Sequence, residues 1–346
     1  MSAPRIDLYS DTHTLPTQAM RQAMAEAEVG DEQNFEDPTV NKLCAMVAEL
    51  LGQEAAVFLP SGTMCNQIAF RVHCQPGDEI ILDYFAHPIN AESGGPSALA
   101  QAQTRTLHTE HGIFTAEQVR GAFRRVNRNT PRSRVLAVEN TTNAGGGSVW
   151  PIEDIAAVTA TARENDMVTH MDGARLMNAV VAAGVPAAEF AATVDSVWLD
   201  LSKGLGCPVG AVLAGSHEFI HEAWRWKHRI GGAMRQAGVI AAAGTWALAH
   251  HVDRLAEDHE NAKLLAEQIS ELDGVVLVND KIETNLVFFD VSGTGQSARD
   301  ISARLRDKGI WIGAINERRM RAVTHLDVGR QDIVEASDAL AEILAG

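Results

Sequence analysis

Short apolar runs alternate with helix-like stretches between residues 55 and 215, and this alternation constrains the fold more than any other feature of the chain. The stretches between the runs include TAEQVRGAFRRV at 115–126 and IEDIAAVTATARE at 152–164, whose apolar spacing is typical of helices. Strands that alternate with helices predict an α/β fold with a mostly parallel sheet. The runs that read as buried strands are AAVFLP at 55–60, EIILD at 79–83, RVLAVEN at 134–140, MVTHMD at 167–172 and VWLDL at 197–201.

The chain changes character after about residue 216, where helices dominate, and again after Gly274, where shorter strands return. We interpret this second part as a smaller α+β domain. With 346 residues, the chain is also long for a single hydrophobic core. The sequence therefore predicts a large domain at 15–246 and a small domain made of 1–14 and 247–346.

Polar residues follow the apolar runs at four places. Ligands gather at the carboxyl ends of strands in α/β sheets, so we expect these four places to lie close together. Taken alone, each has an ordinary explanation: a capped helix start, an ion pair, or a lysine without a catalytic role. The four places are Ser61-Gly62-Thr63, Glu139-Asn140, Asp172 and Lys203.

Taken together, the four strand ends indicate pyridoxal phosphate. A lysine in a partly apolar pocket has a lowered pKa and can form a Schiff base with an aldehyde, which suits Lys203. The ring nitrogen of the cofactor needs an anionic partner, and Asp172 fits that need. The phosphate needs a helix start, which Gly62 and Thr63 provide.

The chain resembles the threonine aldolase and β-eliminating lyase family of fold-type I pyridoxal-phosphate enzymes. The match runs along most of the chain, and eight motifs in the family's order make it specific. They are SDTHTLPTQAM, FEDPTVNKL, PSGTMCNQ, ENTTNAGGG, HMDGARLMNA, SKGLGCPVG, GGAMRQAG and VTHLDV.

The resemblance implies a role for each matching residue. Lys203 would hold the cofactor covalently, Asp172 would pair with the ring nitrogen, and His87 would stack on the ring. Arg235 would reach the phosphate of a neighbouring subunit, so the resemblance implies a homo-oligomer, either a dimer or a tetramer. The cofactor-binding set is Ser61, Gly62, Thr63, His87, Glu92, Asp172, Arg175, Lys203 and Arg235, and the substrate carboxylate would meet Ser10, Arg175 and Arg321.

The chain departs from the family's pattern where the β-carbon of the substrate is expected. Ala91 stands where the family usually has a tyrosine, and Thr142 stands where it has a histidine that faces the β-hydroxyl. Both changes remove bulk and a hydrogen-bonding group, which predicts a substrate other than threonine, with a larger or differently substituted β-carbon. His13 replaces an apolar residue and is a candidate replacement imidazole, while a solvated loop position is the plainer explanation. His228 replaces a basic side chain.

The resemblance implies cleavage of a β-hydroxy-α-amino acid to glycine and an aldehyde, with His87, Asp172 and Lys203 as the catalytic candidates and His87 or a water as the base. His13, a departure from the family, is a further catalytic candidate. β-Elimination or transamination on the same scaffold is the alternative, and a pseudoenzyme that only binds the cofactor is another. A nucleotide-binding α/β protein is a further class. It would need a Gly-x-Gly-x-x-Gly turn, which SGTMCN at 61–66 lacks.

Charge and composition narrow the range of partners. The net charge of −16 argues against nucleic acid or an anionic membrane surface, since both require clustered Lys and Arg. The four cysteines show no metal-ligand spacing, and we expect free thiols and no metal. No segment has the apolar length of a signal peptide or a membrane span, so we expect a cytoplasmic enzyme whose partner is a small-molecule substrate, an amino acid.

Overall fold

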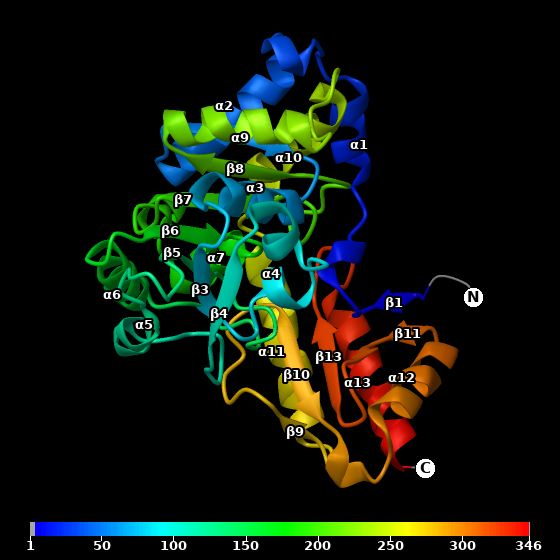
Figure 1. Cartoon of the computed structure of the whole chain (residues 1–346). Helices are drawn as coiled ribbons and strands as arrows, with labels where there is room; N and C mark the ends of the chain where they lie inside the picture. Colours follow the sequence, from blue (N-terminus) through cyan, green and yellow to red (C-terminus); the bar gives the residue numbers. More distant parts are fainter. Residues whose placement is uncertain (1–3, 346) are drawn as a thin grey trace.

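The computed structural model describes residues 4–345, so residues 1–3 and 346 of the predicted small domain lie outside the described residues. A seven-stranded sheet forms the larger part of the molecule, in the order β2-β8-β7-β6-β5-β3-β4 (Figure 1). Its strands are β2 (Ala55–Leu59), β3 (Glu79–Asp83), β4 (Gln103–Leu107), β5 (Ser133–Glu139), β6 (Val168–Asp172), β7 (Ser196–Asp200) and β8 (Ala211–Gly215).

Every strand of this sheet runs in one direction except β8, which pairs antiparallel with both β2 and β7. The predicted α/β fold with a mostly parallel sheet is therefore confirmed. Because β2 has the same direction as β7, the carboxyl ends of β2, β5, β6 and β7 face the same edge of the sheet. The four polar strand ends of the sequence lie at that edge.

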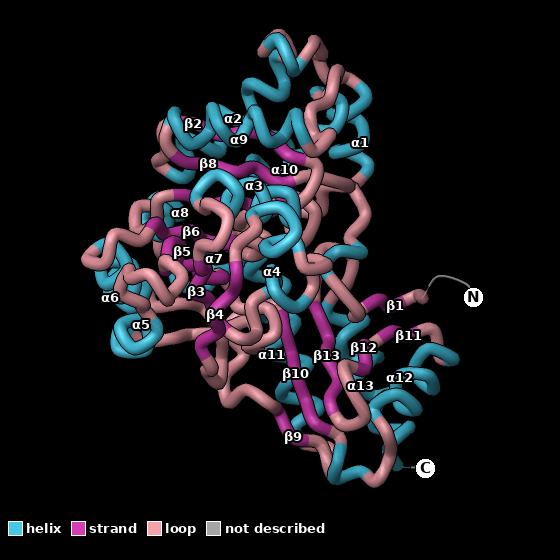
Figure 2. The backbone as a smooth tube through the Cα atoms, in the orientation of Figure 1, coloured by secondary structure: helices cyan, strands magenta, loops and turns pink. Residues whose placement is uncertain are grey.

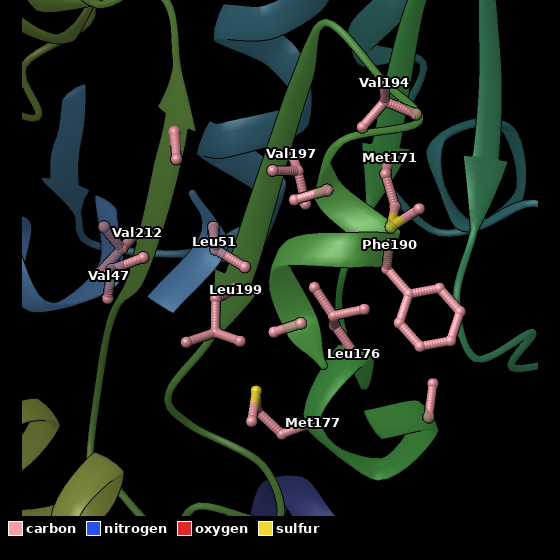
Figure 3. Packing of buried hydrophobic residues seen from close by; sticks show 14 of the residues in the cluster. Val47, Leu51, Met171, Leu176, Met177, Phe190, Val194, Val197, Leu199 and Val212 are labelled. Atoms are coloured by element: carbon pink, nitrogen blue, oxygen red, sulfur yellow. The ribbon is translucent and has the colours of Figure 1, made fainter. Parts of the chain in front are cut away.

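Helices cover both faces of the sheet, and the alternation of side chains along each strand supplies both cores. Val197 and Leu199 of β7 point to one face, where they meet Leu51 of α2 and Leu176 of α7 (Figure 3). Trp198, between them, points to the other face. The first face is covered by α2 (Pro38–Leu51), α6 (Ile152–Arg163), α7 (Leu176–Ala183) and α8 (Ala187–Ala191), and the second by α3 (Gly62–His73) and α9 (His217–Arg229).

Local sequence signals fix where several helices begin. Asp37 accepts hydrogen bonds from the first turn of α2, and Pro38 follows at the first helical position. Thr115 and Gln118 form a capping box at the start of α5, which ends at Ala122 rather than near residue 126 as predicted. The remaining helices of this part are α1 (Gln18–Ala25), α4 (His87–Asn90), α5 (Ala116–Ala122) and α10 (Gly238–His250), with short turns η1 (Asp11–His13), η2 (Glu32–Asn34) and η3 (Pro96–Ala100).

A second, four-stranded antiparallel sheet lies in the C-terminal part of the chain, in the order β12-β13-β10-β9 (Figure 2). Its elements are β9 (Val276–Leu277), β10 (Leu286–Asp290), β12 (Gly313–Ala314) and β13 (Arg319–Val323), with α11 (Leu255–Ser270), η4 (Ser292–Thr294), α12 (Ala298–Asp307) and α13 (Arg330–Ala345). The N-terminal strand β1 (Ile6–Asp7) pairs in parallel with β11 (Ile310–Trp311). Ile6 and Leu8 are buried in the core of this second part.

At the N-terminus, Ile6 and Leu8 pack with the C-terminal part, whereas Asp11 and Thr14 contact Arg175 and Lys203, which follow strands of the large sheet. The boundary after residue 246 falls inside α10, which packs against α1 and α2. The division into domains stays a prediction. Within residues 4–345, no helix has the length and apolar character needed to cross a membrane.

Candidate active site

A cavity of about 360 Å³ opens at the carboxyl ends of β2, β5, β6 and β7. Ten of the residues singled out from the sequence line it, and they come from segments far apart in the chain: Ser10, Ser61, Gly62, Thr63, His87, Glu139, Asp172, Arg175, Lys203 and Arg321. The remaining lining residues are Thr12, Asn143, Ala174, Trp198, Asp200 and Ser202.

Lys203 projects from a tight turn that follows β7. Its backbone carbonyl accepts hydrogen bonds from Gly206 N at 2.8 Å and from Thr14 Oγ1 at 2.9 Å. Gly206 has a φ of 77°, a left-handed conformation that glycine adopts without strain. The Nζ atom is ion-paired with Asp200 and lies 5.7 Å from the centre of the Trp198 ring. The turn therefore presents one half-buried amine to the cavity.

Asp172, at the end of β6, is a buried carboxylate whose hydrogen-bond donors are both neutral. Asn66 Nδ2 donates to Oδ2 at 2.8 Å, and the backbone N–H of Ala174 donates to Oδ1 at 3.0 Å. Burial raises the pKa of Asp172 to about 7, and the nearby carboxylates Glu139 and Glu92 add to this effect. A cationic group placed at the cavity side of Asp172 would restore its ionisation.

His87 begins α4 and links two buried carboxylates. Its Nδ1 lies 2.9 Å from Glu92 Oε1, and its backbone N–H donates to Glu139 Oε2 at 3.0 Å. The hydrogen bond to Glu92 raises the pKa of His87, whereas burial raises the pKa of Glu139. The pair of carboxylates fixes the imidazole at the cavity wall and makes it a stronger base than a free histidine.

The first turn of α3 faces the same cavity. Ser61 Oγ accepts a hydrogen bond from Met64 N at 3.2 Å, which caps the helix. A Cβ atom added to Gly62 would come within 2.2 Å of the Trp198 ring, so no residue with a side chain fits at this position. Gly62 and Thr63 line the cavity at this helix start, and the backbone N–H groups of a helix's first turn are the groups that bind phosphate.

Two arginines converge on the opposite wall. Arg175 forms a bidentate ion pair with Asp11, in which both N···O distances are 2.7 Å. Burial by itself would raise the pKa of the Asp11 carboxyl, but the charge of Arg175 holds this pKa below its usual range. Arg175 Nη1 and Arg321 Nη1 both donate to Asn143 Oδ1, at 3.4 and 3.3 Å. Burial, with the neighbouring charge of Arg175, lowers the pKa of Arg321. Such a pair is suited to a carboxylate.

Two of the predicted cofactor-binding residues, Glu92 and Arg235, do not line this cavity. Glu92 contacts His87, Asn66 and Gln67, and its charge adds to the raised pKa of Asp172. Arg235 is 63% exposed, forms an ion pair with Asp31 and faces a different cavity.

His13 lies outside the cavity lining, and this arrangement gives no support to its predicted catalytic role. Its Nδ1 is 2.9 Å from Asp7 Oδ2, and its ring stacks on Tyr9 and tilts against Trp311. These contacts hold the imidazole in the small-domain surface. Thr142 is also absent from this wall. It is buried against Gly112 and Gly145, so its expected place beside the β-carbon of the substrate is not supported.

A second cavity of about 400 Å³ adjoins the first, and His87 and Asn143 line both. Ala91 lines the second cavity, together with the aromatic side chains of Phe85 and Phe288. Ala91, where a larger side chain was expected from the family's pattern, therefore borders the free volume of the second cavity. The wall also contains Asn90, Glu110, His111, Ala144, Gly145, Val278, Asn279, Ile315, Asn316 and Arg319.

Sequence reasoning missed several residues that shape the first cavity: Asp11, Asn66, Asn143, Trp198 and Asp200. A signal was present for two of them. Asp200 is a carboxylate inside an apolar strand, and Asn66 is an amide within a helix that packs on the sheet, and both are costly to bury without a partner. For the other three, the partners lie in distant parts of the chain.

Comparisons with known proteins agree with this geometry. Residues 7–292 match the model of a family described as β-eliminating lyase. The chain is 40% identical over 333 residues to the low specificity L-threonine aldolase of Escherichia coli strain K12, with 96% of this chain and 97% of that protein covered. It is 39% identical to low-specificity L-threonine aldolase 1 of Arabidopsis thaliana, with 95% and 93% covered.

Solved structures share the fold of this chain. The threonine aldolase of Leishmania major superposes with a TM-score of 0.84 at 17% identity, covering 98% of this chain and 99% of that chain. The serine palmitoyltransferase of Sphingomonas wittichii superposes with a TM-score of 0.76 at 18% identity, covering 97% and 86%. At these identities the likeness concerns the fold alone.

Proposed function

Because the chain belongs to the β-eliminating lyase family, we propose that it is a pyridoxal-phosphate-dependent lyase that cleaves β-hydroxy-α-amino acids to glycine and an aldehyde. The observation that carries the proposal is the content of one cavity. One cavity of about 360 Å³ is lined by Lys203, by the carboxyl group of Asp172, by the start of α3 and by two convergent arginines. The relatives that cover nearly the whole chain are named threonine aldolases.

The residues present fit pyridoxal phosphate. Lys203 offers the amine, and the turn at Gly62, where a side chain would strike Trp198, leaves backbone N–H groups for the phosphate. Asp172, with its raised pKa and neutral donors, suits a cationic ring nitrogen. When bound, the cofactor supplies an electron-withdrawing ring that takes up charge from a bond broken at the α-carbon of an amino acid.

The chain's own side chains orient the substrate and move its proton. Arg321 and the free end of Arg175 bind the α-carboxylate, and Asn143, which now accepts from both, keeps the two guanidinium groups together. This clamp sets which α-carbon bond lies in the reactive orientation. We assign the β-hydroxyl proton to His87, whose raised pKa, caused first by Glu92, makes it a stronger base.

A product analysis tests the proposed reaction. The purified enzyme with pyridoxal phosphate is expected to release glycine and aldehyde in equal amounts from a β-hydroxy-α-amino acid. β-Elimination, the alternative reaction, gives ammonia and a 2-oxo acid without glycine. Detection of those products in place of glycine would refute the aldol assignment.

The second cavity indicates which substrates are preferred. It begins at His87 and Asn143, where the β-carbon is expected, and its volume of about 400 Å³ exceeds the ~150 Å³ that already holds benzene in an apolar cavity. Threonine would leave this volume empty. We therefore propose a substrate whose β-carbon carries a group larger than the methyl group of threonine.

Filling this cavity is expected to change specificity. In Ala91→Tyr, the kcat/KM for a β-hydroxy amino acid with a large β-substituent should fall about 10- to 100-fold, because the added ring occupies the pocket. The kcat/KM for L-threonine on the same variant is the control and should change little. Steady-state kinetics with both substrates measure the ratio. An equal loss for both would show that Ala91 does not border the substrate's side chain.

We also propose a homo-oligomer, at least a dimer. Arg235 does not line the Lys203 cavity of its own chain but a basic surface hollow beside the exposed Phe35. A neighbouring copy would cover this apolar group and bring Arg235 toward a second active site. Light scattering at assay concentration should give the mass of at least two chains. A fully active monomer would exclude this arrangement.

A further inference from the structure

Asp200 is the last residue of β7, three positions before Lys203, and its side chain is only 4% exposed. Its Oδ2 atom is ion-paired with Lys203 Nζ. Its Oδ1 atom accepts hydrogen bonds from Ser202 N at 2.7 Å and from Ser202 Oγ at 2.9 Å. Because the two oxygens have separate partners, the carboxylate cannot rotate away without losing bonds. A fixed anion therefore lies against the nitrogen that would carry the cofactor.

The other carboxylates near Lys203 are engaged elsewhere. Asp11 is neutralised by Arg175, and Glu139 accepts from two backbone N–H groups. Asp172 lies on a different strand, β6, and accepts hydrogen bonds from its two neutral donors, Asn66 and Ala174. Among residues 4–345, Asp200 is the carboxylate in ion-pair contact with Nζ. The charged or titratable groups that line this cavity are His87, Glu139, Asp172, Arg175, Asp200, Lys203 and Arg321, with Asp11 behind Arg175 and the buried thiol of Cys65 behind Asp200.

We propose that Asp200 is a catalytic residue that holds the proton on Lys203 Nζ while this nitrogen is bonded to the cofactor. A protonated nitrogen makes the attached carbon more electrophilic, and hence more open to attack by the substrate amine. An opposite charge in direct contact favours the protonated form by about 1–3 pH units. The Trp198 ring, 5.7 Å from Nζ, acts in the same direction. The role rests on the proposed function, since it presupposes that Lys203 binds the cofactor.

The test is a pH titration of the visible absorbance of the protein loaded with pyridoxal phosphate. The band of the protonated lysine-bound cofactor should lose its proton about 1–3 pH units lower in Asp200→Asn than in the wild type. Asp200→Glu keeps a carboxylate and should restore most of the shift. Glu49→Gln, which changes an exposed side chain on α2, alters the net charge equally and should leave the midpoint unchanged.

Equal midpoints in the wild type and Asp200→Asn would overturn the role of Asp200 while the proposed function stands. A wild type without a visible band would instead refute the cofactor assignment, and the role of Asp200 with it. If Asp200→Asn fails to fold, Asp200→Ala gives the same comparison. Loss of lysine-bound cofactor in both neutral variants would also count against the proposal, because Asp200 would then act in binding rather than on the proton.

Discussion

Lys203→Ala is expected to abolish covalent attachment of pyridoxal phosphate and to lower the kcat for glycine release by at least about 10³-fold. The reason is that the variant loses both the amine that anchors the cofactor and a proton-carrying group at the reacting centre, the second alone being worth about 10²–10⁴-fold. Borohydride reduction, digestion and mass spectrometry measure the attachment. The wild type should yield one labelled peptide that contains Lys203, and the variant none.

A matched control guards this result against non-specific labelling. Lys263 is exposed on α11, far along the chain from the cavity lining, and Lys263→Ala should keep both the label and the activity. Lys227 is the alternative attachment site to be tested, because it is a fully buried lysine in an ion pair with Glu32. A labelled peptide that contains Lys227 instead of Lys203 would move the active site to another part of the molecule.

Asp172→Asn is expected to lower kcat by about 10²–10³-fold, because the ring nitrogen of the cofactor would lose the anion that stabilises its positive charge. Unlike Lys203→Ala, the variant should still form the covalent linkage, as shown by the borohydride-reduced peptide. Retained linkage with lost turnover therefore separates the ring-nitrogen role from a general loss of structure. Unchanged kcat would remove Asp172 from the mechanism.

The same substitution has a predictable effect on the stability of the cofactor-free protein. The pKa of Asp172 is raised from 3.8 to about 7, so the folded protein binds this proton more tightly than the unfolded chain does. Its contribution is fully present below pH 3.8 and is lost as the pH rises to about 7, by up to ~4 kcal/mol. Denaturant unfolding between pH 4 and pH 8 should show this loss in the wild type relative to Asp172→Asn. Parallel pH profiles would contradict it.

Much of the site could be predicted because strand ends in a parallel sheet converge by geometry. The runs that end at Asp172 and near Lys203, and the helix start at Gly62, needed only the strand pattern and the rule that ligands lie at carboxyl ends. The likeness to threonine aldolase and serine palmitoyltransferase structures confirms the predicted fold-type I architecture. The four cysteines, expected to be free thiols, are free in the structure.

The parts that could not be predicted are contacts between distant segments. Asn66 is oriented by Trp198, whose indole N–H only donates and therefore fixes the amide oxygen, so that Nδ2 points to Asp172 and Glu92. No local sequence pattern reveals such a series of hydrogen bonds. The catalytic role predicted for His13 stays a prediction without structural support, because closeness to Ser10 in sequence said nothing about the contact of His13 with Trp311.

Carbon–carbon bond formation from glycine tests the central claim most directly. An enzyme that cleaves a β-hydroxy-α-amino acid to glycine and an aldehyde must also catalyse the reverse reaction, which an enzyme limited to β-elimination cannot do. The purified protein is incubated with pyridoxal phosphate, ¹³C-labelled glycine and an aldehyde, and the products are followed by NMR. We expect the label to appear in a β-hydroxy-α-amino acid, in larger amount with a bulky aldehyde than with acetaldehyde. Label that stays in glycine, while β-hydroxy amino acids are converted to ammonia and a 2-oxo acid, would contradict the account.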